Sequence, residues 1–180
     1  VAQALADFHA ATRGATLPDW LPQPEPLLTP MAALWGRGMA TESLRGVVDM
    51  AGDQRDAARD WLETALPTLW QASRRLPGVE PPLALLHLDV RSDNLRWARG
   101  GLALVDWPHV AIGPPELDAA AFAQSVTVEG GPAAEQVMAW YGERGPLRGE
   151  ALDAAVSWLA AFFAYHAWRP DLEGLPRLRL

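Results

Sequence analysis

The stretch between residues 83 and 106 constrains the fold most, because it carries the one clear pattern of β-strands in the chain. Leu83–His87 is a short apolar run, and two further runs, Leu95–Ala98 and Leu102–Val105, flank the turn residues Arg99-Gly100-Gly101. Short apolar runs separated by a Gly-containing turn predict strands and a hairpin. The sequence therefore predicts one small β-hairpin insert.

Apolar residues recur with a helical period on both sides of this insert. We expect a first helix over Ala2–Arg13 and a longer one capped by Asp53, which Pro67 should kink or restart because proline lacks a donor and clashes with the preceding turn. A last, central and buried helix is expected over Glu150–Trp168, and the Pro-rich stretch Pro18–Pro30 is expected to be a connection. The predicted fold class is α+β and mostly helical.

Composition favours a single domain over residues 1–180 and narrows the class of protein. Hydrophobic residues make up 49% of the 180, which is enough for an ordinary core. The net charge of −7 argues against a nucleic-acid partner, and the absence of cysteine excludes disulfides and thiolate metal sites. No apolar run reaches the roughly 20 residues of a membrane helix, and no signal peptide is recognisable. We expect a cytoplasmic protein with no membrane partner.

A polar motif follows the first predicted strand. Residues 87–94 match the pattern H-x-D-x-x-x-x-N, and twelve residues after Asn94 the last predicted strand ends in Asp106. Because a hairpin returns the chain between them, we expect the oxygens of Asp89, Asn94 and Asp106 to converge. Phosphoryl transfer needs a base near the attacking hydroxyl and hard oxygen ligands for magnesium. The three side chains fit that chemistry.

The motif and its surroundings resemble the catalytic core of the aminoglycoside phosphotransferase and choline kinase-like family, which is itself similar to protein kinases. The resemblance is specific over residues 83–122 and includes Gly113-Pro114-Pro115 and Leu117-Asp118-Ala119-Ala120. It implies the C-terminal lobe of a protein kinase-like fold. It also implies a small-molecule kinase that uses ATP and Mg²⁺ to phosphorylate a hydroxyl group, with antibiotic resistance as one possible role.

The resemblance assigns roles to the motif residues. Asp89 would be the catalytic base, and Asn94 and Asp106 would bind magnesium. Arg91 stands where protein kinases commonly carry a lysine that faces the γ-phosphate, so it is a second catalytic candidate, although it equally fits a surface arginine. His87 and Asp118 would be structural, with Asp118 bracing the catalytic loop.

The chain departs from the family in what it lacks. Such kinases grip the nucleotide with a Gly-rich loop and a strand lysine, whereas these 180 residues contain no lysine, and Gly36-Arg37-Gly38 lacks a third glycine. We therefore expect the N-terminal nucleotide-gripping lobe to be absent from this chain, and the isolated chain to be a poor kinase or none. Besides the small-molecule substrate, its expected partner is that lobe or a protein that supplies it.

Two other classes of function stay open from the sequence. One is a non-catalytic module that binds a small molecule or a protein and keeps only the helical fold. The joint presence of Asp89, Asn94 and Asp106 favours the kinase over this module. The other is a hydrolase that uses Asp89 with His87, which neither a G-x-S-x-G nor an H-E-x-x-H motif supports. The acceptor itself has no signature in the sequence.

Overall fold

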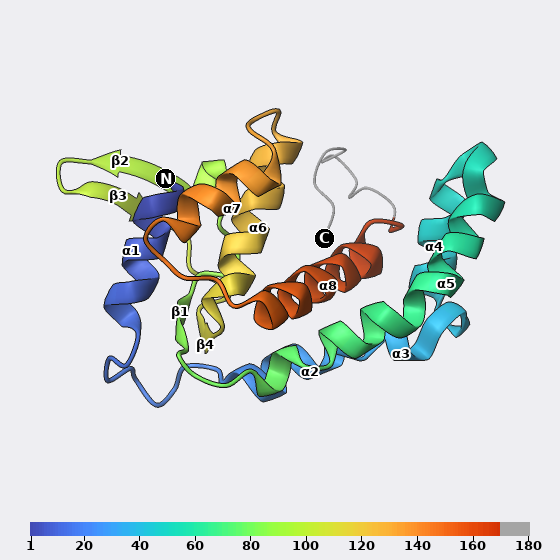
Figure 1. Ribbon diagram of the computed structural model, residues 1–180, viewed down its shortest axis with the longest axis horizontal. Coiled ribbons are helices and arrows are strands. Elements are labelled where there is room, and N and C mark those ends of the chain that lie inside the picture. The colour runs from blue at the N-terminus through green and yellow to red at the C-terminus, as the bar shows by residue number, and fades with distance from the viewer. Residues whose placement is uncertain (170–180) are drawn as a thin grey trace.

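The computed structural model of the protein describes residues 1–169 and is mostly helical (Figure 1). The helices are α1 (Ala2–Thr12), α2 (Pro24–Ala32), α3 (Leu34–Arg37), α4 (Glu42–Met50), α5 (Arg55–Ser73), α6 (Pro115–Val128), α7 (Ala134–Gly142) and α8 (Gly149–His166). The strands are β1 (Ala84–Leu86), β2 (Leu95–Ala98), β3 (Gly101–Leu104) and β4 (Ala111–Gly113). The α+β, mostly helical class is confirmed. Within the described part of the chain, no helix is both long and apolar enough to cross a membrane.

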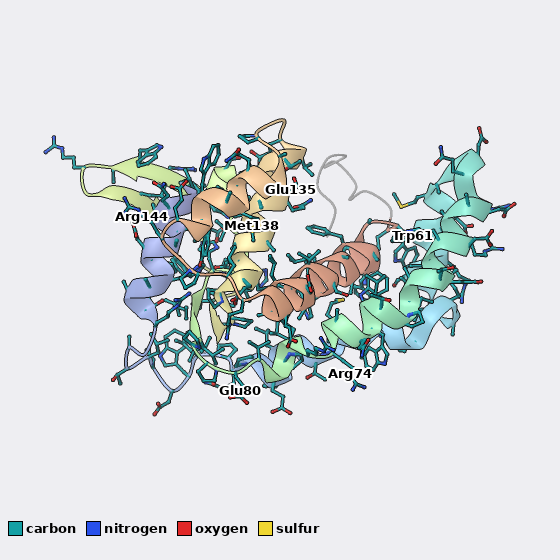
Figure 2. All side chains as sticks on the ribbon, viewed as in Figure 1. Trp61, Arg74, Glu80, Glu135, Met138 and Arg144 are labelled. Atoms are coloured by element: carbon teal, nitrogen blue, oxygen red, sulfur yellow. The ribbon has the colours of Figure 1, made fainter. Side chains whose placement is uncertain are left out.

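Helix α8 lies along the boundary between two halves of the molecule and is counted with the second of them (Figure 2). Figure 1 shows α1, the strands, α6 and α7 on one side of it, and α4 and α5 on the other. We call residues 1–13 and 79–148 the strand half, and residues 14–78 and 149–169 the helix half. Three clusters of buried apolar side chains fill the interior: one in the strand half around Leu5 and Tyr141, one in the helix half around Leu34 and Leu44, and one between them around Leu86.

The strands form two sheets instead of the one hairpin insert that the sequence predicts. β2 pairs with β3 as the expected antiparallel hairpin, whereas β1 pairs antiparallel with β4, with Leu85 opposite Ile112. The sequence analysis missed β4 because it has three residues and ends next to two prolines. The loop between β1 and β2 (residues 87–94), which we call the catalytic loop after its predicted role, thus joins two different sheets. The hairpin follows this loop instead of carrying it.

The prediction of a connection at Pro18–Pro30 is wrong for its second half, because helix α2 begins at Pro24. Proline at the first helical position suits a helix start, since its fixed φ is helical and its missing N–H has no partner there in any case. Pro30 lies inside the helix. Tertiary packing stabilises it, since Leu28 and Ala32 are buried.

Two further predictions for the helix half have different outcomes. α5 runs without interruption from Arg55 to Ser73 with Pro67 inside it, so of the two predicted effects of Pro67 the restart is excluded. Asp53 is not the cap, because it lies in a short 3-10 turn and the capping position falls on Gln54. Thr41 caps α4, since its side chain accepts a hydrogen bond from the Leu44 N–H.

Helix α8 is central, as predicted, but not all of its apolar side chains are buried. The buried side chains are small ones such as Ala154, Ala155 and Ala161, whereas Phe162 and Phe163 are 37% and 41% exposed. Small residues let α8 approach both α5 and α6 closely. The irregular tail expected over Arg169–Leu180 lies outside the described residues from position 170 onward.

Candidate active site

The loop between β1 and β2 brings Asp89 and Asn94 into direct contact. The Asn94 amide nitrogen donates to the Asp89 backbone oxygen and to Asp89 Oδ2, both at 2.9 Å. Asn94 is 4% exposed, and its backbone N–H closes a turn onto the Arg91 carbonyl at 3.0 Å. Since both amide hydrogens are directed at Asp89, the orientation of the Asn94 side chain is set, and its oxygen points away from Asp89.

The hairpin returns Asp106 to this loop. The Val105 N–H donates to the Asn94 carbonyl at 3.0 Å, which extends the β2–β3 ladder by one residue pair. Asp106 is therefore the next residue after the backbone partner of Asn94. It is exposed and has a φ of 62°, the left-handed conformation that turns the chain sharply at the strand end. The structure places all three motif residues on neighbouring backbone, while their catalytic and metal-binding roles stay predictions.

Arg91 lies in the same loop and is tied to carboxylates. Its Nε is 3.3 Å from Asp89 Oδ1 and 3.0 Å from Asp93 Oδ1, and its side chain is 44% exposed. The end of α6 also reaches the loop, because a hydrogen bond from Ser92, and then one from Ser125, hold the pKa of Glu129 below its usual value. The loop therefore presents one exposed cation among several carboxylates.

His87 joins the catalytic loop to the segment that carries Asp106. Its Nε2–H donates to the Val105 carbonyl at 3.0 Å, and its ring lies 4.4 Å from that of Trp107. Its Nδ1 is buried without a hydrogen-bond partner among residues 1–169. A side chain that is 0% exposed and bonded in this way cannot reach a substrate. The predicted structural role of His87 is confirmed by this geometry.

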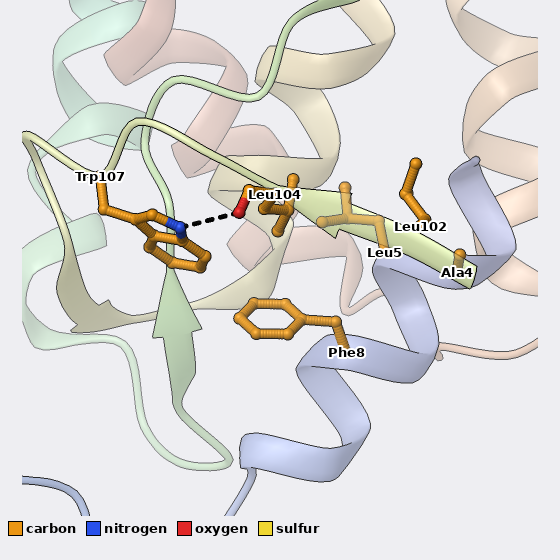
Figure 3. A pocket seen from close by; sticks show the side chains of 6 residues that line it. All are labelled: Ala4, Leu5, Phe8, Leu102, Leu104 and Trp107. Atoms are coloured by element: carbon orange, nitrogen blue, oxygen red, sulfur yellow. Dashed lines mark hydrogen bonds between the residues drawn. The ribbon is translucent and has the colours of Figure 1, made fainter. Parts of the chain in front are cut away.

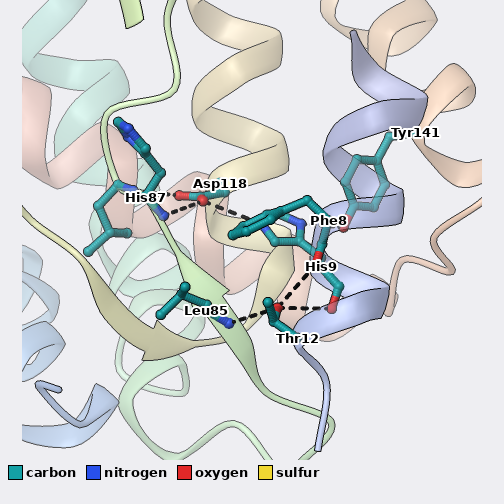
Figure 4. Close-up of polar contacts among 8 residues, drawn as sticks. Phe8, His9, Thr12, Leu85, His87, Asp118 and Tyr141 are labelled. Carbon is teal, nitrogen blue, oxygen red and sulfur yellow. Dashed lines mark hydrogen bonds and ion pairs between the residues drawn. The ribbon is translucent and has the colours of Figure 1, made fainter. Parts of the chain in front are cut away.

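Asp118 braces the loop from α6, as the resemblance implied. Its two carboxylate oxygens accept the backbone N–H groups of His87 and Leu88, at 2.7 and 2.8 Å (Figure 4). Leu88 has a φ of 61°, a conformation that costs a residue other than glycine about 1–2 kcal/mol. Both N–H groups at this strained point are thus bonded to one buried carboxylate, immediately before Asp89.

A buried ion pair fixes the start of α6 against the start of α8. The Arg148 guanidinium donates to both oxygens of Glu116 at 2.8 Å, its backbone N–H donates at 3.1 Å, and a further guanidinium nitrogen donates to the Glu80 carbonyl at 2.5 Å. Burial acts to raise the pKa of Glu116, but the hydrogen bonds and charge of Arg148 outweigh it and leave that pKa below its usual value. The pair holds three segments of the chain together: the start of α6, the start of α8 and the segment at Glu80.

A small apolar pocket opens beside this site, between α1 and β3 (Figure 3). It has a volume of 160 Å³ and is lined by Ala4, Leu5, Phe8, Leu102, Leu104 and Trp107. The Trp107 indole N–H donates to the Leu104 carbonyl at 3.0 Å, which fixes the ring at the mouth of the pocket. The pocket therefore adjoins the residue that follows Asp106.

A comparison with protein-family models decides the family. The model described as "Phosphotransferase enzyme family" matches residues 1–176, nearly the whole chain. The chain belongs to the phosphotransferase enzyme family. None of the curated proteins matches it. The resemblance inferred from residues 83–122 is thereby confirmed, and it extends over the full helical scaffold.

The donor set of this family member suits magnesium. In the part of the chain that the structure describes, no group of three or more His, Asp or Glu side chains is arranged to hold a metal. Magnesium keeps several waters and needs few protein ligands. No described residue donates a hydrogen bond to the Asn94 amide oxygen, so this oxygen and the exposed Asp106 carboxylate are both left for a cation.

Sequence reasoning missed three residues of this family member that organise the site. Glu116, His9 and Tyr141 belong to no motif in the sequence, yet all three are buried side chains with polar groups. One signal was available for His9, since it falls on the apolar face of the first helix together with Leu5. Nothing in the spacing connects it with Asp118, because the two residues are 109 positions apart.

Proposed function

We propose that this chain carries the transfer site of an ATP-dependent small-molecule kinase. The reaction moves the γ-phosphate of ATP to a hydroxyl of a small molecule, either an aminoglycoside-like antibiotic or another small metabolite. One observation carries the proposal: the Asn94 amide holds the backbone and carboxylate of Asp89 while the hairpin returns Asp106 beside them.

Asp89 is placed to act as the base. Its side chain is 30% exposed, so a hydroxyl can approach it. Its Oδ2 accepts a hydrogen bond from the Asn94 amide, and its Oδ1 lies near the Arg91 guanidinium. In the proposed step the acceptor oxygen bonds to the γ-phosphorus, the bond from that phosphorus to the bridging oxygen breaks, and ADP leaves. The hydroxyl proton passes to Asp89.

Asn94 and Asp106 would hold magnesium. The metal would neutralise charge on the phosphate oxygens, which is what this reaction chiefly needs from a catalyst. The residues themselves provide a preorganised pair: the Asn94 amide is fixed by Asp89, and the Asp106 backbone is fixed by the ladder and the left-handed turn. The carboxylates of Asp89 and Asp93 in the same loop would also attract a divalent cation.

The nucleotide needs more cations than the described loop between β1 and β2 supplies. Arg91 is shared between Asp89 and Asp93, and there is no lysine. We therefore propose that a nucleotide-gripping lobe, in the same polypeptide or in a partner protein, packs against the apolar surface around the pocket of Figure 3. Trp97, 74% exposed on β2, extends that surface. The cytoplasm, where ATP is available, stays the expected location.

The test is Asp89→Asn in the full-length gene product, assayed with MgATP against kanamycin, erythromycin, choline, glucose and homoserine as candidate acceptors. We expect turnover to fall by roughly 10²–10⁴-fold, with ATP affinity by calorimetry nearly unchanged. Asp153→Asn is the matched control, because Asp153 is an exposed carboxylate on α8, in the helix half. Full turnover in Asp89→Asn would refute the role of Asp89.

A second experiment distinguishes the kinase hypothesis from that of a non-catalytic binding module. Asp106→Asn should raise the magnesium concentration needed for half-maximal turnover, because an amide is a weaker magnesium ligand than a carboxylate. A wild-type protein that binds an acceptor but transfers no phosphate to any of the five compounds, and that fails to bind MgATP, would favour the binding module.

A further inference from the structure

A chain of buried polar side chains runs from α7 through α1 to the catalytic loop (Figure 4). Tyr141 on α7 contacts His9 on α1, with its hydroxyl 2.8 Å from His9 Nδ1. The other ring nitrogen of His9, Nε2, lies 3.4 Å from Oδ2 of Asp118 on α6. All three side chains are essentially inaccessible, at 1%, 0% and 0% exposure. None of them can touch a substrate, so any effect on a reaction must pass through the loop.

For a neutral His9 ring, the chemistry of the three groups sets the direction of each hydrogen bond. An ionised Asp118 can only accept, and it already accepts the N–H groups of His87 and Leu88. His9 Nε2 must therefore carry the hydrogen that faces Asp118, which leaves Nδ1 as the acceptor in a neutral ring. The Tyr141 hydroxyl must then donate to Nδ1. Burial raises the pKa of Tyr141, so the hydroxyl keeps its hydrogen.

Asp118 needs this support because of what it holds. It bonds two consecutive N–H groups around the left-handed Leu88, and Asp89 is the next residue. Rotation of the Asp118 carboxylate would release one or both N–H groups and let Leu88 relax toward an ordinary conformation. His9 adds a third contact on Oδ2 that opposes this rotation, and Tyr141 sets the ring of His9 in the tautomer that makes the contact.

We propose that His9 and Tyr141 are positioning residues for Asp89, acting through Asp118 and the backbone of Leu88. This inference rests on the proposed function, because it assumes that Asp89 receives the proton of the acceptor hydroxyl. Its consequence is specific: loss of either contact lowers the rate of phosphate transfer while leaving the binding of MgATP and acceptor in place. A merely structural role would lower stability without that split.

The kinetic test uses the full-length gene product and the acceptor among kanamycin, erythromycin, choline, glucose and homoserine that wild type phosphorylates fastest. Tyr141→Phe removes only the hydroxyl, and we expect the single-turnover rate to fall about tenfold, since small displacements of a reacting group have large effects on rate, with KM for both substrates little changed. Ser73→Ala is the matched control, because it also deletes one hydroxyl from a fully buried hydrogen bond, to the Ala32 carbonyl, far from the loop. Its transfer rate should equal that of wild type.

Rescue tests the role of His9. His9→Leu keeps an apolar side chain of similar reach and should slow transfer at least as much as Tyr141→Phe. His9→Gln restores an amide N–H toward Asp118 and should recover much of the rate. Equal rates in the Leu and Gln variants would overturn the proposal, because the donor to Asp118 would then be irrelevant.

Hydrogen exchange gives a readout that does not depend on activity. In wild type the amides of His87 and Leu88 are bonded to Asp118 and should exchange slowly, and in Tyr141→Phe a peptide spanning residues 84–90 should exchange faster than in Ser73→Ala. Unchanged exchange would overturn the proposal, as would faster exchange together with a wild-type transfer rate. Absence of transfer by wild type itself would overturn the proposed function and, with it, the positioning role.

Discussion

The two halves of the molecule bury different kinds of polar group. The strand half buries six side chains that are ionisable or carry an amide: His9, His87, Asn94, Glu116, Asp118 and Tyr141. Among the described residues, the buried polar side chains of the helix half are three hydroxyls: Ser43, Ser73 and Ser157. The rest of the helix half interior is apolar, as in the cluster around Leu34 and Leu44.

This difference indicates that the buried charged groups of the strand half fix the geometry of the backbone at a cost in stability. Burying a charge is unfavourable unless it is paired and fully hydrogen-bonded, so a core built only for stability would contain apolar side chains. In the strand half the buried charges each fix backbone: Asp118 holds the catalytic loop, and Glu116 holds the starts of α6 and α8. The strand half should therefore be sensitive to polar substitutions and to pH, and the helix half to changes of volume.

The largest effect on stability is expected from Arg148→Met. This change keeps the length of the side chain but leaves the Glu116 carboxylate buried, with a side-chain exposure of 1% and no cation. Loss of one partner of a buried pair costs about 3–5 kcal/mol in the free energy of unfolding, which urea unfolding of the full-length gene product would measure. Arg144→Met is the control, since its pair with Asp7 is more than half exposed and should contribute under about 1 kcal/mol. An equal loss of unfolding free energy in both variants would contradict the predicted difference between the two ion pairs.

The same pair predicts how stability depends on pH. The pKa of Glu116 is lowered in the folded protein from its ordinary value of 4.5, so the folded state favours the ionised carboxylate. Its contribution is fully present above pH 4.5 and is lost as the pH falls through the lowered pKa. Between wild type and Arg148→Met, the difference in the free energy of unfolding should shrink as the pH is lowered through this window. A difference that stays constant down to pH 3 would show that another group dominates.

Asp118→Asn should have the next largest effect on stability and a large effect on turnover. The amide keeps the shape of the side chain but turns its NH₂ group toward a backbone N–H, so one buried donor loses its acceptor at a cost of about 1–3 kcal/mol. Because the affected N–H belongs to His87 or Leu88, turnover should fall by more than the loss of stability explains. Asp153→Asn, an exposed carboxylate on α8, should change neither quantity. Turnover equal to wild type in Asp118→Asn would show that the charge of Asp118 is not needed to position the loop.

The candidate site was largely predictable because its main contacts are local. Asp89 and Asn94 are five positions apart in one loop, and a hairpin turn at residues 99–101 is enough to return Asp106 to them. The motif therefore specifies the approximate geometry, while the roles of its residues stay predictions. The same reasoning identified Asp118 only through the resemblance, because no local pattern joins α6 to the loop.

The supporting network was not predictable because its contacts are long-range. His9 and Tyr141 are 132 positions apart, and neither belongs to a motif. The errors in the helix half have a different cause: α2 and the continuous α5 form despite their prolines, since tertiary burial outweighs local propensity. Pairing of the three-residue strands β1 and β4 likewise depends on packing that a pattern search does not detect.

Gly46→Ala tests the helix half for sensitivity to volume. A Cβ at this position of α4 would lie 2.7 Å from Cβ and Cγ of Trp168, closer than packed atoms approach. Alanine is otherwise the better helix former, so a net loss of about 1–2 kcal/mol would show that overpacking outweighs propensity. Gly142→Ala in α7 is the matched control, because nothing lies within 4 Å of its added Cβ, and it should be neutral or stabilising. Turnover of both variants should match wild type.

The smallest effect is expected from Thr41→Ala, which removes a hydrogen-bonding side chain in the helix half. Thr41 caps α4 by accepting the Leu44 N–H at 3.4 Å, and it donates to the Gly38 carbonyl at 3.0 Å. Loss of such a cap lowers the free energy of unfolding by about 0.5–1 kcal/mol, and Thr41→Ser should keep most of it. Because the described contacts of α4 are with other elements of the helix half, α5, α8 and the short 3-10 turn at residues 38–40, the transfer rate should not change. A slower transfer rate in Thr41→Ala, restored in Thr41→Ser, would show that a polar contact of the helix half also positions the loop. The two halves would then differ in the kind of polar group that they bury, but both would serve the reaction.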